Sequence, residues 1–563
     1  MKRKNQWLFF LIAFIALNVL AARFHSRFDL TQEKRFSLSN STKTIVHSLD
    51  DELLIRVFLK GDFPAGFRKL SNTTQEFVSL LKETNSARIR YQFIAPEEDA
   101  GNGKTWADSL TSAGVSPINL TVQVKSGQEN KLVFPVALLT YKGNTAVTDL
   151  YPSSKRVISP EDLATAEAGM EYGFLKNIDR LLHPEQPSVA YAVGNGEPQD
   201  ASVYDLRQIV SANYRFGLYD IKAQPVIPSA INVLLIVKPD TAFTPDEKLK
   251  IDQYVMHGGK VVWFLDNLHA EQDSLQYKPN LIAYDRALNL DDLLFRYGVR
   301  INPDLLMDLQ CDFLPFAVGG SAQAPQFEFL HWNYYPLFEP RGNHLINKNL
   351  GLVAGRFVNS LDTVEAMGIR KTFLLQSSAN ARTISTPALI SLNENRNVAE
   401  DALFKQRNVP AAVLLEGRFT SLFKARISAA QRDSLASYGG FKEAGDSTGK
   451  MVVVSDGDMV LNDFSTKENQ PLPMGMNLFT AGSQYEYQFA NRAFVTNVIE
   501  YLTSNTGIIE SRNKDVILRL LDPKKTETEK TKWQLLNIAL PILFVILAGI
   551  IYQQVRRRRY TQG

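Results

Sequence analysis

Two apolar runs, each flanked by positive charge, lie near the two ends of this 563-residue chain. The first covers residues 7–22 and follows a Lys-Arg-Lys triplet at residues 2–4. The second covers residues 535–552 and is followed closely by four arginines at 556–559. Each run is close to the ~20 apolar residues that a membrane-spanning helix needs. Because Lys and Arg beside a membrane helix stay on the cytoplasmic side, we expect both tails inside the cell and the body outside the cytoplasm.

The first run has two interpretations. Its basic start, short apolar core and small residues towards its end are also typical of a cleavable signal peptide. Either a retained anchor or a cleaved signal would export the body, so the expected topology does not depend on the choice. The second run contains Asn537 and Pro541, but the four arginines after it favour a membrane span over a core helix.

Composition indicates folded material between the two runs. The chain is 45% hydrophobic and 21% charged, which is ordinary for globular proteins. Removing the seven cations of the two tails turns the formal net charge from +3 to −4, so the body has no basic excess and we expect no nucleic-acid partner. A single cysteine, Cys311, excludes an internal disulfide.

We expect a membrane-proximal α/β domain over residues 28–182, after a tail and membrane helix at 1–27. A strand at 53–59, an amphipathic helix at 67–82 and an alternating strand at 87–94 predict a β-α-β unit. Further strands and a closing helix are predicted at residues 120–124, 131–141, 146–150 and 160–182.

A second α/β domain is expected over residues 183–522. Its strands are continuous apolar runs at residues 188–193, 231–237, 261–265 and 450–454. Thr244, Pro245 and Glu247 form a capping box that opens a helix between two of these strands, and another helix is predicted at 485–502. Apolar strands alternating with helices indicate a doubly wound parallel sheet covered on both faces.

Three further segments complete the expected organisation. A large insertion, at about residues 270–445, interrupts the second domain. A charged linker follows at 523–532, and the second membrane helix with its basic tail occupies 533–563.

The first candidate site is Gly194-Asn195-Gly196-Glu197, directly after a predicted parallel strand. Ligands of open α/β sheets bind at the carboxyl ends of the strands, and these residues could contact one. The alternative is a tight turn whose glycines relieve backbone strain.

The second candidate comprises Asp456, Asp458 and the nearby Asp463. Three carboxylates could hold a hard cation through oxygen ligands, although their spacing does not match the twelve-residue calcium loop. The alternative is a turn and a helix cap, for which Asp is a common residue. We therefore assign no metal and no cofactor from the sequence.

Motifs for catalysis are absent from the sequence. There is no Gly-x-Ser-x-Gly elbow, no His-x-His or His-x-x-x-His pair, and no Gly-x-x-x-x-Gly-Lys-Ser/Thr loop. Cys311 has no glycine pair beside it to build a sharp nucleophile turn. These absences predict a protein that is not an enzyme and does not itself bind ATP through a P-loop.

Four segments together resemble a known family. The first is Asp29-Leu-Thr-Gln-Glu-Lys-Arg-Phe-Ser-Leu-Ser39, and the second is Val189-Ala-Tyr-Ala-Val-Gly-Asn-Gly-Glu197. The third is the block at 232–266 with its Gly-Gly-Lys core, and the fourth is Asn491-Arg-Ala-Phe-Val-Thr-Asn-Val-Ile-Glu-Tyr-Leu502. In this order, between two terminal membrane helices, they are similar to the gliding-motility-associated ABC transporter auxiliary (GldG) family.

The resemblance implies a subunit that pairs with an integral-membrane permease and a cytoplasmic ATPase of an ABC-type system associated with gliding motility. It implies the bacterial cytoplasmic (inner) membrane, with both termini cytoplasmic and the body periplasmic. It also implies a central domain similar to class I glutamine amidotransferases, whose nucleophilic cysteine is missing from the turns of this chain. The ligand is unknown.

Two alternatives to this non-enzymatic transporter subunit stay open from the sequence. One is an exported glycan- or peptidoglycan-acting hydrolase that would use acids such as Glu197, Asp266, Asp456 or Asp458. The other is an envelope scaffold without a ligand.

Overall fold

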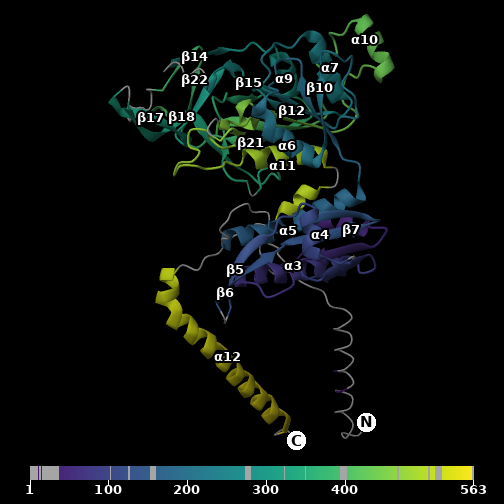
Figure 1. Ribbon diagram of the computed structural model, residues 1–563, viewed down its shortest axis with the longest axis vertical. Helices are drawn as coiled ribbons and strands as arrows, with labels where there is room; N and C mark the ends of the chain where they lie inside the picture. Colours follow the sequence, from purple (N-terminus) through teal and green to yellow (C-terminus); the bar gives the residue numbers. More distant parts are fainter. Residues whose placement is uncertain are drawn as a thin grey trace.

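The structure is a computed structural model. It describes residues 37–560, apart from 102, 125–126, 152–159, 273–279, 322–323, 349, 393–401, 466–467, 505–506 and 514–522, together with Leu11 and Phe14. Two α/β domains are stacked along the long axis of the molecule, and one long helix runs away from them (Figure 1). The predicted N-terminal membrane helix lies outside the described residues except for Leu11 and Phe14.

A ten-stranded sheet forms the centre of the larger domain, and half of it is parallel. The neighbouring parallel strands are β10 (Arg215–Asp220), β9 (Ser188–Val193), β11 (Val233–Val237), β12 (Lys260–Phe264) and β25 (Gly449–Val454). The chain passes from β9 to β10 on one side and then to β11 on the other, so the direction of winding reverses at β9. These strands confirm the parallel sheet that the apolar runs predict.

Helices cover both faces of this parallel half. On one face, α6 (Tyr204–Asn213) and α11 (Asn491–Thr503) share a core with alternate strand residues, among them Tyr191, Leu235 and Val262. On the other face, α7 (Pro245–Met256) and α9 (Asp291–Tyr297) pack against the intervening residues, among them Trp263. Because both faces are buried, the inner strands are almost wholly apolar, which explains why they read as continuous runs.

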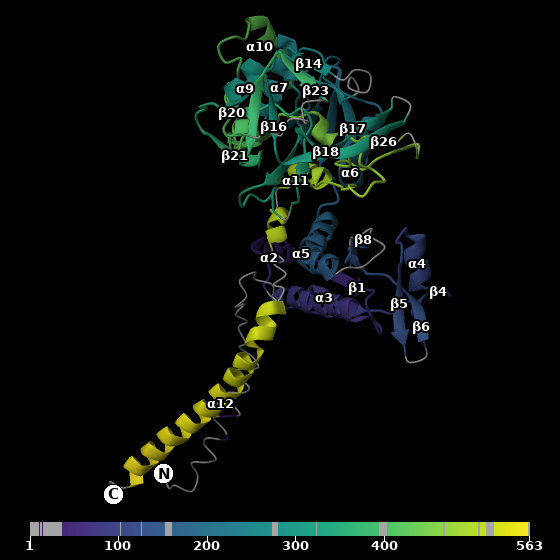
Figure 2. The same ribbon diagram turned by 90° about the vertical axis from the view of Figure 1, so that its left-hand side faces the viewer.

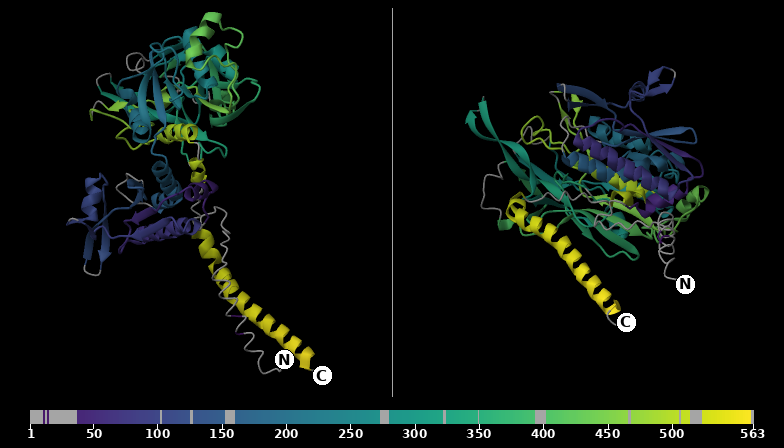
Figure 3. Two further views of the ribbon diagram at one scale, coloured as in Figure 1. Left: turned by 90° about the vertical axis from the view of Figure 1, so that its right-hand side faces the viewer. Right: turned by 90° about the horizontal axis from the view of Figure 1, so that it is seen from below.

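The insertion does not interrupt the sheet but extends it. Four of its strands continue the sheet beyond β25 in antiparallel fashion, namely β24 (Pro410–Gly417), β21 (Ile369–Gln376), β18 (Ala324–Pro340) and β17 (Cys311–Ser321). A short strand, β19 (Val353–Ala354), pairs with β18. The β17–β18 hairpin projects from the domain when the molecule is seen from below (Figure 3).

The smaller domain is a two-layer α/β unit. Its sheet has the order β2 (Ile89–Phe93), β1 (Leu53–Val57), β7 (Val136–Tyr141) and β8 (Asn144–Asp149). Strands β1 and β2 are parallel and are joined by α3 (Ala65–Thr84), which confirms the predicted β-α-β unit. One apolar core joins this sheet to α3, α5 (Pro160–Leu182) and α2 (Asn40–His47). A separate hairpin consists of β5 (Ile118–Val124) and β6 (Gly127–Val133).

Two predicted elements differ from the structure by more than a few end residues. The single strand expected at 131–141 is divided between β6 and β7, because Pro135 cannot donate a ladder hydrogen bond. The helix expected at 485–502 begins six residues later, at Asn491. The Tyr485 ring instead packs against Phe313 and Phe329, with ring centroids 4.8 and 5.1 Å apart.

The C-terminal helix α12 (Pro523–Tyr560) includes the segment expected to be a linker. Its residues 528–558 are long and apolar enough to cross a membrane, and among the described residues it is the one helix of this kind. None of its apolar stretch is buried inside the body, and Figure 2 shows it leaving the two domains. A helix that is apolar all round and exposed to water would be unfavourable, so its composition indicates burial in lipid or against another protein.

Candidate functional site

The turn after β9 holds the first predicted site in a tightly packed conformation. Gly194 and Gly196 have φ angles of +121° and +83°, which favour glycine. A side chain at Gly196 would place its Cβ only 3.0 Å from the Cβ of Asp240. The carbonyl of Asn195 accepts hydrogen bonds from the backbone N–H groups of Asp240 and Thr241, at 2.8 and 2.9 Å. The turn is therefore closed against the loop that follows β11.

The polar side chains of this turn point into the protein. Asn195 and Glu197 are buried, and the Glu197 carboxylate accepts the backbone N–H of Asn195 at 2.7 Å. The Asn195 amide donates to Glu247, the capping-box residue of α7, at 3.1 Å. Burial raises the pKa of Glu197 above its usual range. These contacts tie β9 to the start of α7, and they give the turn a packing role.

The second site lies at the carboxyl ends of three neighbouring parallel strands. Lys238 directly follows β11, Asp266 follows β12 by two residues, and Asp456 follows β25 by two residues. Asp458 begins a short 3₁₀ helix just beyond. Adjacent parallel strands end at the same edge of a sheet, so these polar residues meet there. We call Lys238, Asp266, Asp456 and Asp458 the ion cluster.

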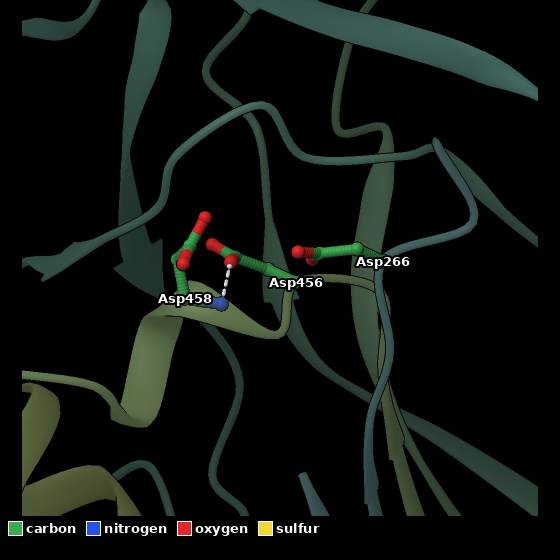
Figure 4. A group of neighbouring side chains, drawn as sticks. All are labelled: Asp266, Asp456 and Asp458. Carbon is green, nitrogen blue, oxygen red and sulfur yellow. Dashed lines mark hydrogen bonds between the residues drawn. The ribbon is translucent and has the colours of Figure 1, made fainter. Parts of the chain in front are cut away.

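The three aspartates of the ion cluster converge on one small volume (Figure 4), with ligand-type oxygens all within 4.8 Å of one another. The ammonium of Lys238 lies among them, 2.5 Å from the Asp458 carboxylate and 3.2 Å from that of Asp266. Lys238 has a φ of +42°, which is uncommon for a residue with a side chain. The backbone is therefore strained at Lys238, the residue that carries the positive charge of the cluster.

Backbone donors fix two of the three aspartates. Asp456 accepts the backbone N–H groups of Asp458 at 2.8 Å and of Arg356 at 2.9 Å, and Asp266 accepts that of Gly457 at 2.5 Å. Burial, followed by the neighbouring carboxylates, raises the pKa of Asp456 well above its usual range. Burial also raises the pKa of Asp266. Asp456 and Asp266 are therefore expected to retain protons to a higher pH than exposed aspartates would.

Two arginines from the insertion complete a network of ion pairs around the cluster. Arg286 pairs with Asp240 at 2.7 Å and with Glu271 at 2.6 Å, and Glu271 also contacts Lys238 at 2.9 Å. Arg356 forms a two-pronged pair with Asp463, at 2.8 and 2.7 Å. Each of these cations thus faces carboxylates supplied by the protein itself.

The structure brings together some of the residues that the sequence suggests and separates others. Asp456 and Asp458 do share a site, but their third carboxylate is Asp266, because Asp463 pairs with Arg356. The Gly194–Glu197 turn forms a separate site, which contacts the ion-pair network through Asp240.

Sequence reasoning missed Lys238, although a signal for it existed. Lys238 is the first polar residue after an all-apolar strand, as Asp266 is after the next one. Arg286 and Arg356 come from loops of the insertion and have no comparable local signal.

The arrangement leaves little room for chemistry. A cavity beside Asp458 and Arg356 has a volume of about 20 Å³, which is enough for about one water molecule. A metal ion bound by the three aspartates would have to displace the Lys238 ammonium. In the described part of the chain, the carboxyl edge is therefore filled by internal ion pairs.

Replacing Lys238 tests this interpretation. We expect Lys238→Met to lower the free energy of unfolding of the central domain by about 3–5 kcal/mol, because buried carboxylates lose their counter-charge. Urea unfolding followed by tryptophan fluorescence would measure it. The control is Lys442→Met, which removes a surface pair with Asp446 and should cost less than about 1 kcal/mol. Equal losses in the two variants would contradict a structural role for the cluster.

The raised pKa of Asp456 gives a prediction about pH. An unfolded aspartate ionises near pH ~4, whereas folded Asp456 keeps its proton to a higher pH. Between these two values the folded state binds more protons, so the free energy of unfolding falls as pH rises. Asp456→Asn cannot ionise, and its stability should fall less steeply over this window. The free energy of unfolding would be measured against pH for the wild type, this variant and the exposed-site control Asp433→Asn. Equal slopes for the wild type and Asp456→Asn would contradict the raised pKa of Asp456.

Comparisons with known proteins give a family and a distant relative. A family model described as an ABC-type uncharacterized transport system matches residues 186–498, and a domain of unknown function matches residues 32–140. An uncharacterized protein of Borreliella burgdorferi is 20% identical over 416 residues, covering 71% of this chain and 75% of that protein.

Solved structures give only weak similarity. The mmIFT52 N-terminal domain is 13% identical, with a TM-score of 0.31, and the match covers 56% of this chain and 98% of that one. A putative ThuA-like protein from Parabacteroides merdae is 10% identical, with a TM-score of 0.26, covering 57% of this chain and 90% of that one. No conclusion about the fold follows from scores this low. Because the transport-system model matches more than half of its residues, the chain belongs to the family of ABC-type uncharacterized transport system proteins.

Proposed function

We propose that this protein is a non-enzymatic, membrane-anchored subunit of an ABC-type transporter complex associated with gliding motility. It would pair with a separate integral-membrane permease and a cytoplasmic ATPase. The observation that carries the proposal is the exposed apolar helix α12 in a member of a transport-system family. Such a helix needs lipid or protein around it, and a permease supplies both surroundings.

The charges around α12 support an orientation. Arg556–Arg559 closely follow the apolar stretch, which favours a cytoplasmic C-terminus in the bacterial inner membrane and a periplasmic body. The basic residues at 2–4 favour a cytoplasmic N-terminus by the same rule, if the first apolar run is retained as a helix.

The ion cluster supports a role without catalysis. At the edge where an α/β enzyme would bind its substrate, Lys238 and the arginines are already paired with carboxylates of the same chain. Cys311 is buried in β17, and burial raises the pKa of its thiol, so it is a poor nucleophile. We therefore propose a similarity to class I glutamine amidotransferases in fold and not in activity.

Crosslinking tests the proposed partners. A photo-reactive residue at Ile542, which is 54% exposed on α12, should capture a multi-span permease, and its ATPase should co-purify in mild detergent. The same residue at Tyr438, exposed in the 3₁₀ helix Ala436–Tyr438 of the central domain, is the matched control and should not capture the permease. Mass spectrometry identifies the products. Recovery of a lone monomer, with no permease captured from Ile542, would contradict the proposal.

Substituting the candidate acids separates a transporter subunit from an exported hydrolase. We expect normal motility in Glu197→Ala, Asp266→Ala, Asp456→Ala and Asp458→Ala wherever the variant keeps its melting temperature. Motility assays read beside thermal unfolding distinguish lost folding from lost chemistry. A variant that is fully folded and yet loses motility would instead favour the hydrolase. A ligand-free envelope scaffold predicts the same normal motility, but without capture of a permease.

A further inference from the structure

Three parts of the chain meet at the last turn of α11. One is α5 of the membrane-proximal domain, and another is α11 itself, the final helix of the central domain. The third is η7 (Ile508–Asn513), a 3₁₀ helix that follows α11 and precedes α12 in the chain. Figure 2 shows α11 above this junction, with α5 and α2 beside it.

One polar group links all three parts. The Glu500 carboxylate on α11 accepts a hydrogen bond from the Tyr172 hydroxyl on α5 at 2.6 Å. The same oxygen accepts a second bond from the Arg512 guanidinium on η7 at 3.0 Å. The guanidinium also lies 3.9 Å from the centre of the Tyr172 ring and donates to Asn497 on α11. Each of the three residues therefore contacts the other two.

This group is shielded from water. Glu500 is only 7% exposed, and the Arg512 side chain is 19% exposed. A charged pair with so little solvent around it contributes more than a surface pair, and removal of one partner leaves a buried charge without compensation. The geometry, with one carboxylate oxygen shared by two donors, makes the three residues dependent on one another.

On one side, η7 belongs to the membrane-proximal domain. Ile508 is part of the apolar core that α2, α3 and α5 form with the sheet of that domain. Ile509 and Ser511 are also buried, and the Ser511 hydroxyl closes the 3₁₀ turn on the Ile508 carbonyl. The chain has thus left the central domain and entered the core of its neighbour within a few residues of α11.

On the other side, the end of α11 is fixed to the central sheet. The ammonium of Lys260, at the start of β12, donates to the Leu502 carbonyl at 2.5 Å. The Tyr501 hydroxyl donates to Glu416 of β24 at 2.6 Å, and the Lys450 ammonium of β25 lies 4.0 Å from the Tyr501 ring centre. Cations at a helix C-terminus bind its free carbonyls and interact favourably with its dipole. The last turn of α11 therefore moves with the sheet.

We propose that Tyr172, Glu500 and Arg512 form a latch that holds the two α/β domains in one relative orientation. The latch joins an element fixed to the central sheet to elements fixed in the membrane-proximal core. Domains of one chain move relative to each other unless their interface is large and apolar, so a buried charged group at the joint is the restraint here. Opening the latch frees the central domain to change its angle to the membrane-proximal domain. The inference does not depend on the proposed transporter role.

Distance measurements between the domains test the latch. Spin labels are attached to the full chain in detergent at Glu76→Cys on α3 and Asp433→Cys on α10 (Ala429–Leu435), both at exposed positions. The native Cys311 is buried and does not compete for the label. We expect a narrow distance distribution in the otherwise wild-type protein and a broadened one in Arg512→Met. The matched control is Arg300→Met, which removes an Arg–Asp pair with Asp362 inside the central domain and should leave the distribution narrow.

Hydrogen exchange supplies a second readout. In Arg512→Met the backbone amides of η7 should exchange about 10- to 100-fold faster than in the wild type, as expected for loss of a charged hydrogen bond. Tyr172→Phe removes only a hydroxyl and should give a smaller change in the same direction. Exchange in β11 and β12 should stay slow, and it shows whether the central domain is folded.

The two variants together decide the outcome. Unchanged distances and unchanged η7 exchange in both Arg512→Met and Tyr172→Phe would overturn the latch. An equal broadening in Arg300→Met would overturn it as well, because the effect would then not be specific to the joint. If Arg512→Met fails to fold, the comparison of Tyr172→Phe with the wild type is decisive by itself.

Discussion

The ammonium of Lys238 is buried at the carboxyl edge of the central sheet, and much of that edge is arranged around it. A buried charge is tolerated only when opposite charges and hydrogen bonds replace the water it has lost. Asp266 and Asp458 supply the charges, and backbone N–H groups hold Asp266 and Asp456 in place. Arg286 and Arg356 then pair with two neighbouring carboxylates, Glu271 and Asp463. The carboxyl edge, where doubly wound folds bind ligands, is therefore occupied by ion pairs within the protein.

The two edges of the parallel sheet contact different parts of the protein. The carboxyl edge is closed by the ion cluster, whereas the amino edge, where Lys260 begins β12, holds the end of α11. From there the chain passes through η7 into the core of the membrane-proximal domain and on towards α12. The central domain is therefore connected to the membrane side of the molecule through its amino edge, and the ion cluster lies at the opposite edge.

Several elements could be predicted from local sequence because their signals are local. The strands β9, β11, β12 and β25 are continuous apolar runs, since both of their faces are covered by helices. The start of α7 carries its own capping box at Thr244 and Glu247, and both hydrogen bonds of that box are present. Asp456 and Asp458 lie close together in the structure because they are two residues apart at the end of a strand.

Other features could not be predicted because they depend on residues far apart in the sequence. The sequence pattern of residues 270–445 does not indicate that its strands extend the same sheet. An antiparallel strand has the same pattern whichever sheet it joins. The ion cluster needs Lys238 and Asp458, 220 residues apart, and the latch joins Tyr172 to Glu500, 328 residues apart. The sequence by itself determined the apolar strands, the capped helix and the long apolar helix near the C-terminus, because each follows from hydrophobic period and neighbouring residues. Only the tertiary structure decided which charges are paired and where the two domains are joined. The paired groups are far apart in the sequence, and they need one another because folding buries them away from water.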